Sequence, residues 1–180
     1  MLKLVSFGAA AVALAAAAVA LGAPAKSTYT YKATITPASE VPRPSAPAKA
    51  RGVFTATVTE NGAARSIRWT LTFRNLSGKA VAAHIHKGKP GVAGTVLLGL
   101  CGPCRTGQTG RATISSDVAD ALEQGRAYVN VHTAKNTAGE IRGQIKLVKR
   151  SEATATEPQP TPTPAPAPTP GDGGGGYDPY

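Results

Sequence analysis

The segment Ser66–Arg74 limits the possible folds most, because apolar and polar residues alternate along its whole length. A period of two is typical of an antiparallel strand with one buried face. Val53–Thr59 precedes it with a similar pattern, and Asn61-Gly62 between the two is a strong hairpin signal. The residues of the apolar face in the longer segment are Ile67, Trp69, Leu71 and Phe73. The pattern predicts a β-hairpin packed on a core.

Six more segments have the composition of short strands: Tyr29–Thr36, Ala80–His86, Thr95–Leu100, Arg111–Ser115, Ala127–Thr133 and Ile141–Val148. Only Asp117–Gln124 has a helical pattern, with Ser116 as its expected N-cap and Gly125 at its end. Its apolar residues Val118, Ala121 and Leu122 would face the core. We therefore predict an all-β fold, an antiparallel, Greek-key-like β-sandwich of about 7–8 strands with one short helix.

The two ends of the chain differ from this central region. Lys3, an apolar run and the small residues Ala23-Pro24-Ala25 predict a secretory signal over residues 1–25. A membrane-spanning helix is the alternative, since the run is long enough, but the small-residue exit favours cleavage. No later apolar segment is long enough to span. Residues 151–180 are rich in Pro, Thr and Gly, which predicts a disordered tail. One domain over residues 26–150 remains.

Charge is concentrated in that domain. Residues 26–150 hold 19 Lys and Arg against 6 Asp and Glu, a net charge of +13, whereas the tail is acidic. An exported domain with this charge attracts polyanions, such as an anionic wall polymer, an acidic polysaccharide or shed nucleic acid. The basic residues form no dense run, so no specific nucleic-acid site is predicted. The alternative is that the charge only keeps a monomer soluble.

All three histidines fall in two of the expected strands, Ala80–His86 and Ala127–Thr133. Alternation places His84, His86 and His132, together with Tyr128 and Asn130, on the face opposite the apolar residues Val81, Ala83, Ile85, Val129 and Val131. Two residues apart on one strand, side chains start about 7 Å apart, since each residue rises roughly 3.3 Å. If the strands are neighbours, the three imidazoles converge on the outer face of one sheet.

Three imidazoles with an open position suit zinc or copper. The sequence therefore gives His84, His86 and His132 as a candidate site for one of these metals. Asn130, Glu140 and Arg142 are expected beside it, and Glu140 could orient a ligand. In the alternative, these polar side chains only hydrogen-bond one another and hold loops in place.

Cys101-Gly102-Pro103-Cys104 repeats the residues of the thioredoxin redox motif, but no amphipathic helix follows it. That redox chemistry needs the first cysteine at a helix N-terminus, where its pKa is lowered. In an exported protein with two cysteines, a structural disulfide between Cys101 and Cys104 is the expectation. A redox-active pair and a pair of metal ligands are the alternatives.

Several motifs together resemble the CHRD domain, the module repeated in chordin and found alone in many exported bacterial proteins. The resemblance covers about residues 29–148 and rests on Glu40-Val41-Pro42, Leu71-x-Phe73-x-Asn75-Leu76-x-Gly78, Ala83-His84-Ile85-His86-x-Gly88-x-x-Gly91-x-x-Gly94, and Tyr128–Thr133 followed by Gly139–Gln144. It implies an extracellular β domain and little about activity. The Cys101–Cys104 loop is not part of the family pattern.

A weaker similarity is to copper-zinc superoxide dismutases, which hold copper with a His-x-His strand and a later histidine. It implies copper roles for His84, His86 and His132, with Arg142 as an anion guide. That family also needs a bridging histidine and further zinc ligands, and this chain has no fourth histidine. A binuclear site is therefore excluded.

Three functions follow from the sequence. The first is a secreted, non-enzymatic binding module that associates with the cell surface or with anionic extracellular polymers. The second is a mononuclear copper or zinc site at the three histidines, with superoxide or other redox activity. The third is thiol–disulfide chemistry at Cys101 and Cys104.

Overall fold

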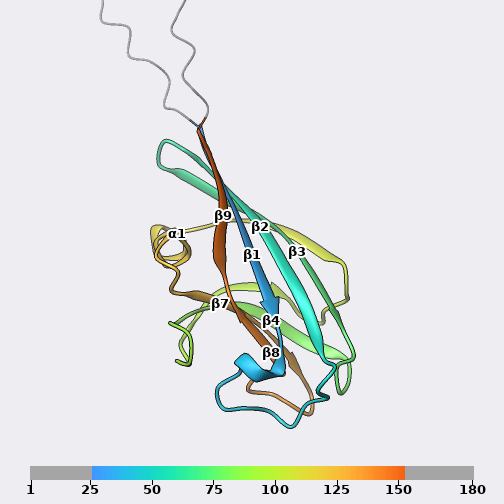
Figure 1. The fold of residues 1–180 in the computed structure, drawn as a ribbon. Helices are drawn as coiled ribbons and strands as arrows, with labels where there is room; N and C mark the ends of the chain where they lie inside the picture. Colours follow the sequence, from blue (N-terminus) through green and yellow to red (C-terminus); the bar gives the residue numbers. More distant parts are fainter. Residues whose placement is uncertain (1–25, 153–180) are drawn as a thin grey trace, which may run out of the picture. The chain divides into compact units, whose positions relative to one another are not determined.

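The computed structural model describes residues 26–152, and these form nine strands in two antiparallel sheets with one short α-helix. The expected all-β sandwich is confirmed. In Figure 1 the long strands β1, β2, β3 and β9 run side by side, and β4, β7 and β8 cross behind them. The expected signal (residues 1–25) and most of the expected tail lie outside the described residues. Within residues 26–152, no helix is long and apolar enough to cross a membrane.

The five-stranded sheet has the order β6-β3-β2-β1-β9. Its strands are β1 (Lys26–Ile35), β2 (Arg51–Asn61), β3 (Ala64–Arg74), β6 (Gln108–Thr113) and β9 (Lys146–Glu152). The expected hairpin joins β2 to β3, with Asn61 opposite Ala64 and Gly62 at a φ of 57°, a left-handed conformation that suits glycine. β9 returns beside β1, which gives the Greek-key order in which a late strand lies next to the first.

The four-stranded sheet has the order β5-β4-β7-β8. Its strands are β4 (Ala80–Lys87), β5 (Val96–Cys101), β7 (Ala127–Thr133) and β8 (Ile141–Gln144). The core lies between the two sheets and is built mostly of aliphatic residues, with Phe54 and Trp69 as large aromatic members. Trp69 packs over Gly110 of the neighbouring strand, where a Cβ would lie 2.2 Å from the indole ring. The packing of Trp69 therefore requires glycine at position 110.

Two strand predictions differ from the structure in more than the bounds of a strand. Ile141–Val148 was expected to be one strand, but the chain changes sheets at Ile145, so β8 and β9 belong to different layers. Alternation continues through Ile145, which is fully buried, and so cannot reveal the change. Val81 was expected in the core but is 43% exposed, because the pairing of β4 with β7 is irregular between Ala80 and Ala82.

The helix α1 (Ser116–Glu123) begins one residue earlier than predicted, with Ser115 and not Ser116 as its N-cap residue. The three residues expected to face the core, Val118, Ala121 and Leu122, are buried. Gly125 follows the helix at a φ of 63°, in its expected role at the helix end. A 3-10 turn, η1 (Pro37–Ser39), lies between β1 and β2. β9 runs through Glu152, two residues beyond the expected end of the domain.

Candidate functional site

The face of the four-stranded sheet that points away from the core carries a row of polar side chains. Strand pairing places His84 opposite Asn130 and Asn130 opposite Arg142, while His86 lies opposite Tyr128. The side chains therefore point to the side that alternation predicts. They are not on a solvent-facing surface, however, since Asn130 and Arg142 are each only 2% exposed. The connecting loops at residues 88–95 and 134–140 cover them, so this face forms a second buried layer.

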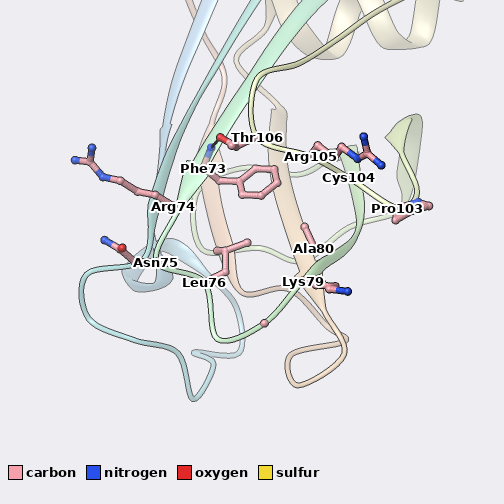
Figure 2. A pocket seen from close by; sticks show the side chains of 11 residues that line it. Phe73, Arg74, Asn75, Leu76, Lys79, Ala80, Pro103, Cys104, Arg105 and Thr106 are labelled. Carbon is pink, nitrogen blue, oxygen red and sulfur yellow. Dashed lines mark hydrogen bonds between the residues drawn. The ribbon is translucent and has the colours of Figure 1, made fainter.

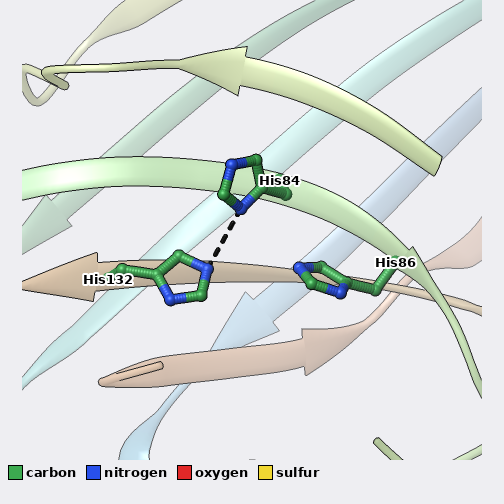
Figure 3. A group of neighbouring side chains, drawn as sticks. All are labelled: His84, His86 and His132. Carbon is green, nitrogen blue, oxygen red and sulfur yellow. Dashed lines mark hydrogen bonds between the residues drawn. The ribbon is translucent and has the colours of Figure 1, made fainter. Parts of the chain in front are cut away.

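The three histidines come together in this layer, as Figure 3 shows. One ring nitrogen from each of His84, His86 and His132 lies within 4.8 Å of those of the other two. Nδ1 of His84 and Nε2 of His132 are 3.1 Å apart. His86 and His132 are each 9% exposed, and His84 is half-buried. We call these three residues the histidine cluster.

Backbone carbonyls set the orientation of two of the rings. Nδ1 of His86 lies 3.0 Å from the carbonyl oxygen of Gly94, and Nδ1 of His132 lies 2.9 Å from that of Thr137. A carbonyl oxygen only accepts hydrogen bonds, so each of these Nδ1 atoms carries the proton in the neutral ring. Nε2 of both rings is then left with a lone pair toward the cluster. His84 can donate its Nδ1 proton to His132 when no ion is bound.

The cluster favours neutral imidazoles. Burial lowers the pKa of His84, and the neighbouring His132 and His86 lower it further. Burial also lowers the pKa of His132, although the bond to Thr137 opposes this effect. Neutral imidazole is the form that binds metal ions. Nε2 of His86 is buried and has no hydrogen-bond partner, so this lone pair is available to a ligand.

The loop that holds His86 is itself held by Arg142. Its guanidinium donates to the carbonyl oxygens of Lys89 and Val92, at 3.2 and 2.8 Å. The same group lies 3.4 Å above the ring of Tyr128, which stacks on His86 at 5.0 Å between centroids. Within this loop, a Cβ on Gly94 would lie 1.6 Å from the carbonyl oxygen of Lys87. The close approach that brings the Gly94 carbonyl to His86 therefore requires glycine.

The loop that holds His132 is held by Glu140, which is fully buried. The carboxylate accepts hydrogen bonds from Thr133 and Asn136, at 2.6 and 2.9 Å, and from both the backbone N–H and the hydroxyl of Ser77. Burial alone would raise the pKa of Glu140, but these hydrogen bonds outweigh it and lower the pKa. We call Glu140, Ser77, Thr133 and Asn136 the Glu140 cluster.

Strand pairing places Asn130 directly between His84 and Arg142, on the side of the sheet that alternation predicts. Glu140 makes its hydrogen bonds within its own cluster, and the loop that it holds supplies the Thr137 carbonyl beside His132. Arg142 was expected to guide anions, but it is 2% exposed and its guanidinium is turned to Tyr128 and the 88–95 loop. Asn130 lies across from His84, with Nδ2 close to Gly139.

Sequence reasoning missed Glu40 as a site residue. Its side chain is 6% exposed and lies against Gly139, where a Cβ would be 2.3 Å from Oε1 of Glu40. Oε1 has no hydrogen-bond partner. Burial raises the pKa of Glu40 to about 7, although Arg142 opposes the shift. The only sequence signal was its place in the Glu40-Val41-Pro42 motif, which does not reveal burial.

Cys101 and Cys104 form the expected disulfide, with Cα atoms 5.2 Å apart. The pair closes a turn at the end of β5, and the one α-helix of the described residues begins only at Ser116. The helix N-terminus that thioredoxin chemistry uses is therefore not beside these sulfurs. Next to the disulfide is a hollow of about 630 Å³. In Figure 2, Phe73 and Leu76 point into it, and the charged ends of Arg74, Lys79 and Arg105 point outward.

The fold and site define a β-sandwich domain whose outer polar layer gathers three histidines under two loops. The chain matches the family model described as the CHRD domain over residues 31–145, and it belongs to that family. This match confirms the resemblance based on the sequence motifs and includes all three histidines. CHRD domains are typically extracellular. No curated protein and no solved structure matches the chain.

Proposed function

We propose that this CHRD-domain protein is an exported, non-enzymatic binding module that holds one copper or zinc ion at His84, His86 and His132. The observation that carries the proposal is that three imidazole nitrogens lie within 4.8 Å of one another, two of them on rings oriented by backbone carbonyls. Such outer hydrogen bonds are typical of metal-binding histidines, because they fix the tautomer and aim Nε2 at the ion.

The spacing of the nitrogens is compatible with an ion after a small movement. Zinc lies about 2.0–2.1 Å from each imidazole nitrogen, which puts tetrahedral ligand atoms roughly 3.4 Å apart. His84 and His132 are already closer than this, at 3.1 Å, and His86 is the ring that moves inward. The Nε2 of His86 gains most from an ion, since an unpaired buried polar atom costs about 1–3 kcal/mol.

The cluster has an open side. Gly99 of β5 lies opposite His84, and a Cβ built on Gly99 would meet no atom within 4 Å. A fourth ligand, such as water, can therefore reach an ion from this side. Three protein ligands with one open position are typical of sites that exchange a ligand, whereas structural zinc sites are closed by four protein ligands.

Metal titration of protein prepared without a histidine tag tests the proposal. Calorimetry with Cu²⁺ and with Zn²⁺ should give one equivalent bound to the wild-type protein. Substitution His132→Ala or His86→Ala should weaken binding by more than the roughly 10–100-fold that loss of an outer hydrogen-bond partner costs. Elemental analysis of the protein as secreted would identify the ion taken up in culture.

Lys87→Ala is the matched control, because Lys87 is exposed on the same strand as His84 and His86. This variant should bind metal like the wild type. If the wild-type protein binds neither ion, or if His132→Ala binds as tightly as Lys87→Ala, the proposal is wrong.

A further inference from the structure

The outer face of the five-stranded sheet, turned away from the core, is basic and rich in threonine. Alternation in these strands puts Tyr31, Phe54 and Trp69 in the core and leaves Lys, Arg and Thr on the outside. Among the described strands, no outward position of this sheet is Asp or Glu. We call this surface the basic sheet face.

Like charges lie directly opposite one another on this face. Strand pairing sets Arg51 against Arg74, Arg68 against Arg111, and Lys32 against Lys146. Like charges directly opposite across strands are destabilising. Folding alone would favour a threonine or a carboxylate at one member of each pair. Three such pairs on one face therefore need a reason other than the stability of the sheet.

The carboxylates of the same strands lie on the other side and are already paired. Glu60 bonds Arg65 at 2.8 Å, and Glu152 bonds Arg150 at 2.8 Å. Neither carboxylate is available to the pairs on the basic sheet face. A shallow depression between β3 and β6 is lined by Arg68 and Arg111 together with hydroxyl groups, a combination that suits a single anionic group.

In one row of the sheet, cationic side chains lie at both edges with threonine between them. Across one row of the sheet, Arg111 and Arg68 at one edge are followed by Thr57 and Thr30, and then by Lys149 at the other edge. Neighbouring strands are about 4.8 Å apart, so this row spans roughly 19 Å. Cations at both ends of a row of threonine hydroxyls suit an extended polymer that carries both anionic groups and hydroxyl groups.

We propose that the basic sheet face binds an acidic polysaccharide. Arginine and lysine at the edges pair with its anionic groups, and threonine hydroxyls hydrogen-bond its sugar hydroxyls. Single-stranded nucleic acid fits less well, because its binding relies on aromatic side chains that stack on the bases, and every aromatic residue of these five strands is on the inner side. This surface is separate from the histidine cluster, so the two proposals are independent.

Affinity chromatography on immobilised polyuronate tests the proposal with the full-length protein. The two face variants are Lys32→Thr with Lys146→Thr, and Arg68→Thr with Arg111→Thr. The matched control is Lys87→Thr with Lys135→Thr, two exposed lysines outside this sheet, which makes the same change in net charge. Thermal unfolding of each variant measures folding, and each face variant should be as stable as the wild type or more stable, since a like-charge pair is removed.

The wild type should be retained at low salt and released steeply as salt rises. For each cation lost from the face, the slope of log retention against log salt should fall by about one, because fewer counterions are released. The control should shift less than either face variant. Equal shifts in control and face variants would show that only net charge matters and would overturn the proposal, as would no retention of the wild type. Stronger binding to immobilised single-stranded DNA of matched charge density would also overturn it.

Discussion

The histidine cluster and the Glu140 cluster lie in the same buried layer but differ in how fully their polar atoms are hydrogen-bonded. Every partner of Glu140 donates a hydrogen bond to it, and its pKa is lowered as a result. In the histidine cluster, Nε2 of His86 has no partner, and burial lowers the pKa of His84 and His132. The polar atoms of the Glu140 cluster are hydrogen-bonded within the chain, whereas the histidine cluster keeps a buried lone pair free on His86.

This difference separates a structural role from a ligand site. A buried carboxylate with a full set of donors fixes the 134–140 loop and needs nothing else. A buried imidazole with a free lone pair, such as that of His86, costs folding free energy unless something binds it. The two clusters are also linked, because the loop fixed by Glu140 supplies the Thr137 carbonyl that orients His132. The Glu140 cluster thus helps to orient a ring of the histidine cluster.

The largest expected effect comes from breaking the Glu140 cluster. Glu140→Gln replaces an acceptor oxygen with a donor group that faces the hydroxyl and N–H donors. We expect it to lower the free energy of unfolding by about 3–5 kcal/mol, the usual cost of breaking a buried charged network. His84→Ala should cost only about 1 kcal/mol in metal-free protein, since this ring is half-buried and makes one hydrogen bond.

Urea unfolding in the presence of a chelator measures both variants under the same conditions. If the two variants lost equal free energy of unfolding, the Glu140 cluster would contribute no more to stability than the ring of His84 does. If Glu140→Gln were as stable as the wild type, the carboxylate would not hold the loop.

A second prediction concerns Glu40, a buried carboxyl that lacks the donors of Glu140. Its pKa in the folded protein is about 7, against an ordinary value of 4.5. A raised pKa means that the protonated form is stabilised by folding, so this contribution is present below pH 4.5 and is lost as pH rises to 7. The change corresponds to roughly 3 kcal/mol at most.

The variant Glu40→Gln keeps a neutral side chain at every pH and so removes this dependence. Its stability relative to the wild type should rise between pH 4.5 and pH 7 and stay constant above that range. Urea unfolding at several pH values measures the difference. A constant difference across the range would mean that Glu40 ionises in the folded protein as it does in the unfolded chain.

The sequence predicted which side of each strand faces the core better than it predicted where strands pair irregularly or change sheets. The alternation in Ser66–Arg74 gave the correct inner face, because a regular strand with one buried side leaves that pattern. Alternation also placed the three histidines on one side of their strands. It could not show the irregular pairing that exposes Val81, or the change of sheet at Ile145, because both depend on strand partners and not on residue order.

The candidate site was predictable in part for the same reason. Alternation placed the histidines on one side of β4 and of β7, whereas the pairing of these two strands is known only from the structure. The roles of Arg142 and Glu140 depend on loops that fold back over the sheet, and residue types alone do not give the path of a loop. Glu40 lies even further from the histidines in sequence, and its burial depends on contact with Gly139, about 100 residues away.

The smallest expected effect tests the open side of the histidine cluster. Gly99→Val places a side chain beside His84, and the space around Gly99 is free, so we expect the free energy of unfolding to change by no more than about 0.5 kcal/mol. In copper-loaded protein, however, added imidazole should bind the ion a few-fold more weakly, because its path past β5 is narrowed. Thr109→Val, on the other sheet, is the control and should leave imidazole binding unchanged. The visible absorption of bound Cu²⁺ reports the titration. Equal imidazole affinity in Gly99→Val and Thr109→Val would mean that external ligands do not reach the ion past Gly99. The histidine cluster would then be open to ligands from another side.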